Sequence, residues 1–164
     1  MKKLLPKTLN NPQGFTLIEL MVVVSIIAFL AVIGVAAFSN AQKTARDGRR
    51  RADIEAIAAA LESNRDTVVG KYQPSSDTAV TTILSTDTNA TFNGYFSSGK
   101  APTDPTNTGT SIYTTKIATK GVSFITCTVL ENGGGNSSDL GTFDSNNNVT
   151  FTTGTANFCI RSRQ

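Results

Sequence analysis

The amino-acid sequence predicts an α+β protein in which a long N-terminal α-helix packs on a small antiparallel β-sheet head. The first observation is an apolar run over residues 15–38, continued by a helical pattern over residues 39–65, with no proline between Pro12 and Pro74. The second is the remainder, residues 66–164, where short β-branched and aromatic segments alternate with clusters of Gly, Pro, Asn and Asp. Such alternation is typical of short strands joined by turns.

A short basic leader, residues 1–14, begins the chain. It contains Lys2, Lys3 and Lys7 and no acidic residue, while the rest of the chain has equal numbers of basic and acidic side chains. The formal charge of +3 therefore comes from this leader alone. Without the leader the chain has no net charge to attract nucleic acid, so nucleic acid is not an expected partner.

The apolar run over residues 15–38 has a single ionisable side chain, Glu19. It is long enough to cross a bilayer, which takes about 20 apolar residues in a helix. A secretory signal peptide has a shorter apolar stretch, followed by a small-residue cleavage site. Such a site can be drawn at Ser39–Ala41, so a secreted protein cut after Ala41 is an alternative. The length of the run favours a membrane helix.

The helical pattern continues through residues 39–65. Small residues recur at spacings of three and four (Ala41, Ala45, Gly48, Ala52), and so do larger apolar ones (Ile54, Ile57, Ala58, Leu61). We expect one helix over about residues 15–64, roughly 75 Å long at 1.5 Å per residue. Gly34 and Gly48 are its weakest points, because glycine destabilises a helix interior.

A basic run lies within this second part of the helix. Its members are Lys43, Arg46, Arg49, Arg50 and Arg51. The preferred interpretation is a charged helix face, partly matched by Asp47, Asp53 and Glu55. Binding of DNA or of lipid head groups by this run is the alternative.

The head is expected to be β-rich. The candidate strands are residues 79–84, 111–117, 122–130 and 148–151, with 122–130 as the central strand and residues 157–162 as an edge strand. Two cysteines, Cys127 and Cys159, lie in this part. If the head is exported, a disulfide is expected, and the chain-entropy model gives it roughly 3–4 kcal/mol. Two unpaired buried thiols are the alternative.

Catalysis has no support in the sequence. The chain has no histidine, and it contains no nucleophile motif and no glycine pattern of the nucleotide-binding kind. We therefore expect a protein that is not an enzyme and that uses no cofactor.

The octapeptide Gln13–Leu20, QGFTLIEL, directly follows the basic leader. It resembles the class III signal of type IV pilins, type II secretion pseudopilins and related filament subunits. The resemblance is strong over residues 1–38. It implies that an inner-membrane prepilin peptidase cuts between Gly14 and Phe15 and N-methylates Phe15. It also implies that the apolar helix is kept as the filament core, with Glu19 as the glutamate of the family.

A role for Glu19 in assembly has a physical basis. A charged side chain in hydrocarbon costs a few kcal/mol even after relaxation. Cleavage after Gly14 creates a second charge, the amine of Phe15, and in a bundle of such helices this amine can meet the Glu19 carboxylate of another chain. Since an unpaired buried charge is strongly disfavoured, such a pair selects the stacking register.

The resemblance also implies partners and a location. The precursor would span the inner or cytoplasmic membrane once, surrounded by lipid, with its N-terminus in the cytoplasm. It would then join a homopolymer, as an extracellular or periplasmic filament, with the help of an assembly platform and a separate ATPase. Counting Lys and Arg on the two sides of the span weakly favours the opposite orientation; the motif and the cysteine pair favour an external head.

Two signals in the head are weaker. Residues 102–113, PTDPTNTGTSIY, resemble the proline–aspartate–proline loop of major pseudopilins. In that class a calcium ion can sit in a loop near the C-terminus, and Asp139 and Asp144 are oxygen donors of the right kind. Their spacing matches no calcium motif, so a solvated loop and no metal is preferred.

Two other functions stay open. One is a pseudopilin of a type II secretion system. The other is a single-pass membrane anchor that displays an extracytoplasmic binding domain and does not polymerise.

Overall fold

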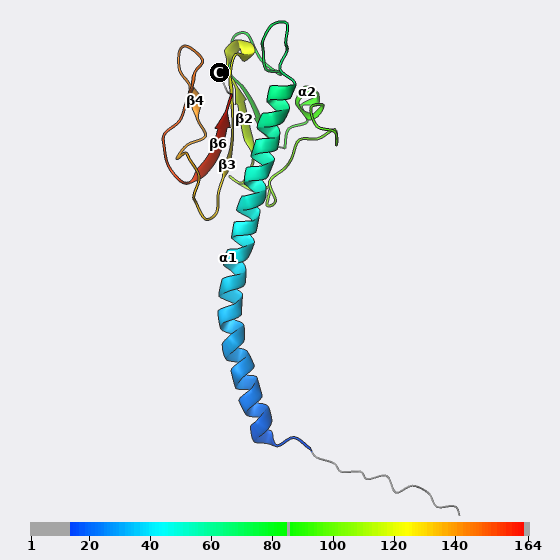
Figure 1. Cartoon of the computed structure of the whole chain (residues 1–164), viewed down its shortest axis with the longest axis vertical. Helices are drawn as coiled ribbons and strands as arrows, with labels where there is room; N and C mark the ends of the chain where they lie inside the picture. Colours follow the sequence, from blue (N-terminus) through cyan, green and yellow to red (C-terminus); the bar gives the residue numbers. More distant parts are fainter. Residues whose placement is uncertain (1–13, 85, 163–164) are drawn as a thin grey trace, which may run out of the picture. The chain divides into compact units, whose positions relative to one another are not determined.

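The computed structural model describes residues 14–84 and 86–162 (Figure 1). The chain divides into two compact units, Met1–Asn40 and Ala41–Gln164. Helix α1 (Leu17–Ser63) is continuous and belongs to both units. A long N-terminal helix with a small antiparallel sheet confirms the predicted α+β fold, and neither Gly34 nor Gly48 interrupts the helix.

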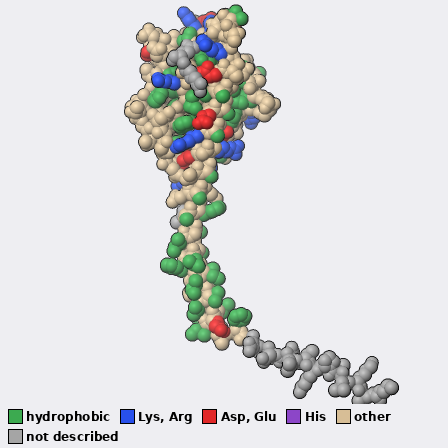
Figure 2. Space-filling view, viewed as in Figure 1, with side chains coloured by type: hydrophobic (Ala, Val, Ile, Leu, Met, Phe, Trp, Pro, Cys, Tyr) green, Lys and Arg blue, Asp and Glu red, His purple; other side chains and the backbone are tan. Residues whose placement is uncertain are grey.

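The first unit is the apolar part of α1. The side chains described between Phe15 and Phe38 are exposed, and Figure 2 shows hydrophobic side chains along this part of the helix. By length and composition, α1 is the one helix in the described residues that could cross a membrane. A helix that is apolar on all sides needs lipid or other helices around it. Residues 1–13 of the leader lie outside the described residues.

The second unit contains a four-stranded antiparallel sheet. Its strands, in spatial order, are β1 (Thr81–Leu84), β2 (Thr114–Ile117), β3 (Phe124–Val129) and β6 (Asn157–Arg161). A separate hairpin pairs β4 (Thr142–Phe143) with β5 (Val149–Thr150). The segment 122–130 is therefore an inner strand and the segment 157–162 an edge strand, as predicted.

Three short elements were not among the expected ones. They are α2 (Ala90–Asn93), β4 and the 3₁₀ turn η1 (Thr119–Gly121). Helix α2 is one turn long, and the Asn89 side chain caps it by accepting a hydrogen bond from the Phe92 amide at 3.0 Å. Elements this short carry no usable periodicity. The equally short β5 (Val149–Thr150) does lie in a predicted segment, residues 148–151.

The core lies on both faces of the sheet. One face packs against the second part of α1, and its cluster includes Ile54, Ile57, Leu61, Tyr113, Ile117 and Phe124. The other face forms a smaller cluster around Ile125, Cys127 and Cys159, covered by the hairpin residues Phe143 and Val149. Strand β3 is buried along nearly its whole length because both of its faces are covered.

Two tyrosines of the head donate to carboxylates of α1. Tyr113 bonds Asp53 at 2.7 Å, and Tyr72 bonds Glu62 at 2.9 Å. Burial and the Asp53 carboxylate raise the pKa of Tyr113 well above its usual range, so the hydroxyl keeps its proton and remains a donor. These bonds satisfy polar groups at the boundary between helix and core.

Candidate processing and assembly site

Residues 14–16 precede the helix in non-helical backbone, and α1 begins at Leu17. The Gly14–Phe15 bond therefore lies just outside the helix. A Cβ added at Gly14 would meet no atom within 4 Å, so nothing in this part of the chain requires glycine there. A requirement for a small residue at this position would have to come from a partner.

Thr16 and Glu19 form a capping box at the start of α1. The backbone N–H and the hydroxyl of Thr16 donate to Oε2 of Glu19 at 2.9 and 2.8 Å, and the Glu19 N–H donates back to the Thr16 hydroxyl at 3.3 Å. This arrangement satisfies amides that the first turn of a helix leaves without partners. Sequence reasoning missed Thr16, although Thr-x-x-Glu before an apolar run is the pattern that marks such a cap.

The capping box gives Glu19 a defined place. Its carboxylate sits at the N-terminus of α1, where the helix dipole favours negative charge. Both Thr16 bonds reach one oxygen, Oε2. Because a carboxylate can accept about four hydrogen bonds, Glu19 keeps room for a further donor such as an amine.

Glu19 also lies within an apolar stripe. A shallow surface groove is lined by Phe15, Ile18, Glu19, Val22 and Val23, which recur at helical spacing. Phe15 is 91% and Ile18 69% exposed. The carboxylate is therefore surrounded by side chains that lipid or another helix would cover.

The basic run predicted on α1 mostly contacts the head. Arg50 is fully buried and donates to Asp104 (2.7 and 3.2 Å), to Asp47 (2.9 Å) and to Glu131 (2.8 Å). Asp47 in turn accepts the backbone N–H groups of Glu131 and Asn132, each at 2.9 Å. A cluster of charges thus joins α1 to the loop at Asp104 and to the loop after β3.

Two of the remaining arginines, Arg46 and Arg51, also contact the head. Arg46 donates to Glu131 at 2.7 Å, and Arg51 donates to the Gly134 carbonyl at 2.8 Å. Arg49 lies 3.7 Å from Asp53 with most of its side chain in solvent. The predicted partners Asp47 and Asp53 thus match Arg50 and Arg49 along α1. Of the three predicted acidic partners, Glu55 is exposed and is absent from the ion pairs of the described residues.

The charge cluster shifts the ionisation of its carboxyl groups. Burial by itself raises the pKa of Asp104, but the hydrogen bonds from Arg50 and Thr106 outweigh it and hold the pKa below its usual range. The hydrogen bond from Arg46 lowers the pKa of Glu131 from 4.5 to about 2. Asp104 also accepts the backbone N–H of Thr106 at 2.8 Å, which shapes the proline-flanked loop. Asp104 therefore joins α1 to this loop through its bonds to Arg50 and Thr106.

Cys127 and Cys159 are joined by a disulfide between β3 and β6. They lie directly opposite each other in the register of the two strands. The bridge links positions 32 residues apart and lies in the second core cluster.

The carboxylates of Asp139 and Asp144 accept hydrogen bonds from backbone amides. Asp139 accepts from Gly141 and Thr152 at 2.8 and 3.0 Å, and Asp144 accepts from Asn146 and Asn148 at 2.8 Å each. The backbone bonds lower the pKa of both groups. In the described residues no three His, Cys, Asp or Glu side chains converge as metal ligands would.

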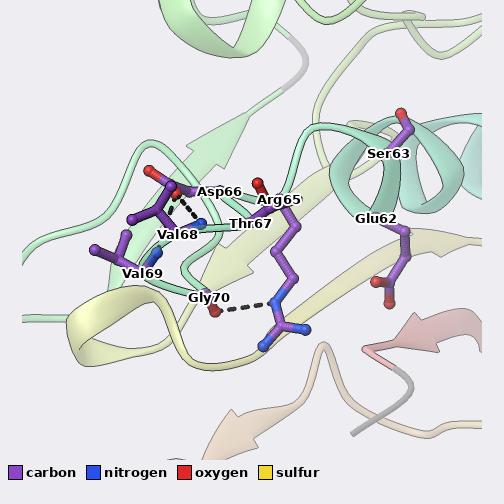
Figure 3. Close-up of a pocket in the computed structure, with 8 residues that line it drawn as sticks. All are labelled: Glu62, Ser63, Arg65, Asp66, Thr67, Val68, Val69 and Gly70. Atoms are coloured by element: carbon purple, nitrogen blue, oxygen red, sulfur yellow. Dashed lines mark hydrogen bonds between the residues drawn. The ribbon is translucent and has the colours of Figure 1, made fainter.

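A surface pocket lies at the C-terminal end of α1 (Figure 3). Its wall is a turn in which Asp66 accepts the amides of Val68 and Val69 at 2.8 and 3.1 Å. Arg65 donates to the Gly70 carbonyl at 2.9 Å. Asp66 and Arg65 therefore close the turn, whereas Glu62, which also lines the pocket, accepts the Tyr72 hydroxyl.

Together, these features describe a chain with an N-terminal apolar helix that is long enough to cross a membrane, and with an α+β head. A family model described as the prokaryotic N-terminal methylation motif matches residues 9–35. This match supports the resemblance to type IV pilin-like and pseudopilin precursors at the N-terminus. Comparison with curated proteins and with solved structures gives no match.

Proposed function

We propose that the chain is a structural subunit of a type IV pilus or pilus-like filament, cut between Gly14 and Phe15 and polymerised through α1. The observation that carries the proposal is the methylation motif at residues 9–35, placed on a helix whose apolar side chains are exposed. A second copy of the same helix is the natural cover for such a surface once it leaves the lipid.

The first step is processing by an inner-membrane prepilin peptidase. The scissile bond precedes α1, so a peptidase can reach it without unwinding the helix. The enzyme would release the leader and methylate the new amine of Phe15. The precursor would be a single-pass protein of the inner or cytoplasmic membrane with its N-terminus in the cytoplasm.

The second step is polymerisation, in which Glu19 selects the register. Its carboxylate is already held at the start of α1 by Thr16 and can accept a further donor. The amine of Phe15 from a neighbouring subunit would supply that donor. The two charges would neutralise each other at one axial offset of the helices only, because every other offset leaves both charges unpaired. An assembly platform and an ATPase would drive this step, and the filament would be extracellular or periplasmic.

The mass of the mature N-terminus tests the processing step. Wild-type chain and a Gly14→Val variant would be produced in cells that contain a prepilin peptidase, and their N-termini read by mass spectrometry. We expect an N-methylated Phe15 in the wild type and uncut precursor in the variant. Normal trimming of the variant would contradict the class III assignment. An N-terminus at Gln42 would instead show a secreted protein.

A type II secretion pseudopilin is the second candidate. Asp104, between Pro102 and Pro105, holds a buried position that resembles the proline–aspartate–proline loop of that class. A membrane-anchored binding domain that does not polymerise is the candidate of another class. Electron microscopy of sheared cell surfaces, with antibody against the head, separates a pilus from both alternatives: labelled surface filaments support a pilus, and label confined to the envelope supports one of the other two.

A further inference from the structure

The outer edge of β6 carries backbone groups that face away from the sheet. The N–H of Ser162 donates to the Phe124 carbonyl on β3 at 3.0 Å, so the backbone groups of Ser162 face β3. Because backbone direction alternates along a strand, the N–H and C=O groups of Asn157, Cys159 and Arg161 face away from β3. The disulfide agrees with this parity: the Cα atoms of Cys127 and Cys159 are 4.2 Å apart, as in a pair that exchanges no backbone bonds. An edge of this kind is a template for another strand.

Asn136 occupies that template beside the disulfide. Its side-chain amide donates to the Cys159 carbonyl at 2.7 Å, and its side-chain oxygen accepts the Cys159 N–H at 2.8 Å. One side chain thus makes both bonds that a residue of a neighbouring strand would make. Next to it, the backbone N–H of Asn136 donates to the Asn157 carbonyl at 2.9 Å, and the Asn157 N–H donates to Ser137 at 2.8 Å.

Gly135 allows this segment to come so close. A Cβ at this position would lie 1.9 Å from the carbonyl oxygen of Asn157, a distance that no side chain permits. Residues 135–137 therefore fit against β6 only with glycine at the first position. The remaining outward position, Arg161, is exposed and charged, and charge on an edge discourages pairing.

The opposite edge of the sheet, β1, is only four residues long. At its last residue, Leu84, the N–H donates to the Asp87 carboxylate at 2.8 Å and the carbonyl accepts the Asp87 N–H at 2.9 Å. A strand this short, with the backbone groups of its last residue already bonded, leaves few groups for pairing with another strand. Of the two edges of this sheet, β6 is the longer, at five residues.

We propose that Asn136 is an edge plug: its side chain replaces a neighbouring strand at Cys159 and so prevents heads from joining edge to edge through β6. The inference does not depend on the proposed function, because it concerns the head alone. It has a consequence for any polymer of this chain. With the β6 edge closed, contacts through the apolar surface of α1 compete with no strand pairing through that edge.

The test uses the full-length chain in detergent micelles, which cover the apolar helix. Asn136→Ala removes both bonds to Cys159. Asn136→Ala combined with Arg161→Thr also removes the charge. Asn146→Ala is the matched control, because Asn146 is an exposed turn residue that bonds Asp144 through its backbone. Exchange of the Cys159 amide is followed by hydrogen–deuterium exchange, and self-association by analytical ultracentrifugation.

We expect the Cys159 amide to exchange at least about fivefold faster in Asn136→Ala than in the wild type. We also expect concentration-dependent self-association that is stronger in the double variant and absent in the control. Asn136→Asp keeps the acceptor for the Cys159 N–H and adds a charge, so it should stay unassociated. Unchanged exchange at Cys159 would overturn the proposal. So would faster exchange without self-association in either Asn136→Ala protein.

Discussion

Arg50 of α1 and Asp104 of the proline-flanked loop form a fully buried ion pair, with Nε of the arginine 2.7 Å from Oδ2 of the aspartate. Neither side chain is accessible to solvent. The pair joins a helix residue to a loop residue 54 positions later. In a small polar head, this contact holds the helix against the loop that precedes β2.

Removing one partner of this pair should be costly. Asp104→Ala leaves the Arg50 charge buried with fewer acceptors, and we expect a loss of about 3 kcal/mol in the free energy of unfolding. Urea titration of the full chain in detergent, followed by tyrosine fluorescence, measures the change. Arg49→Ala is the control: its 3.7 Å ion pair is exposed, so the expected change is within about 0.5 kcal/mol. Equal effects of the two substitutions would contradict the role given to Asp104.

Acid should weaken the same cluster through Glu131. The folded pKa of Glu131 is lowered from 4.5 to about 2, so its contribution is fully present above pH 4.5. The contribution is lost as the pH falls towards 2, because protonation removes the acceptor for Arg46 and Arg50. The midpoint of thermal unfolding, measured from pH 6 to pH 2, should therefore fall less steeply in Glu131→Gln than in the wild type. Parallel curves for the two proteins would argue against this assignment.

The capping box predicts a local effect at the start of α1. Thr16→Val removes the hydroxyl and should cost the first turn about 1 kcal/mol. Faster hydrogen exchange at Glu19 and Leu20 in micelles would show it, with no change in the head. Thr16→Ser retains the hydroxyl and should behave as the wild type. If Thr16→Val protects these amides as well as Thr16→Ser does, the cap contributes nothing.

Glu19 can be tested in two ways that separate its charge from its capping role. Glu19→Gln keeps the capping box but removes the charge, whereas Glu19→Ala removes both. If the charge selects the register, both variants should be processed but yield far fewer filaments than the wild type. The readout is the amount of sheared filament relative to processed subunit in the membrane. Filament formation by Glu19→Gln at the wild-type rate would disprove register selection by charge.

Much of the fold could be predicted from the sequence because the signals are local. The apolar run, the helical spacing of Ile54, Ile57 and Leu61 and the β-branched segments each depend on neighbouring residues, and the structure places α1, β3 and β6 accordingly. The one-turn helix α2 escaped prediction because an element so short has no period. The two-residue strands differ: β5 lies in the predicted segment 148–151, whereas β4 was not predicted.

The candidate site divides in the same way. Gly14, Phe15 and Glu19 lie close together in the chain, so a local motif is enough to predict them, and Thr16 was within reach of the Thr-x-x-Glu pattern. The burial of Arg50 could not be predicted from a local pattern. A run of five basic residues looks like an exposed face, and only contacts with Asp104 and Glu131, 54 and 81 residues away, bury one of them.

The sequence by itself determined the N-terminal motif, the long helix and the segments of the head that form β3 and β6. Each follows from residues close together along the chain. The tertiary structure alone decided which charges are buried and which strand edge is closed. Asn136 shows the reason: its two bonds reach Cys159, 23 residues later. Such a pairing depends on positions in space that local sequence patterns do not encode.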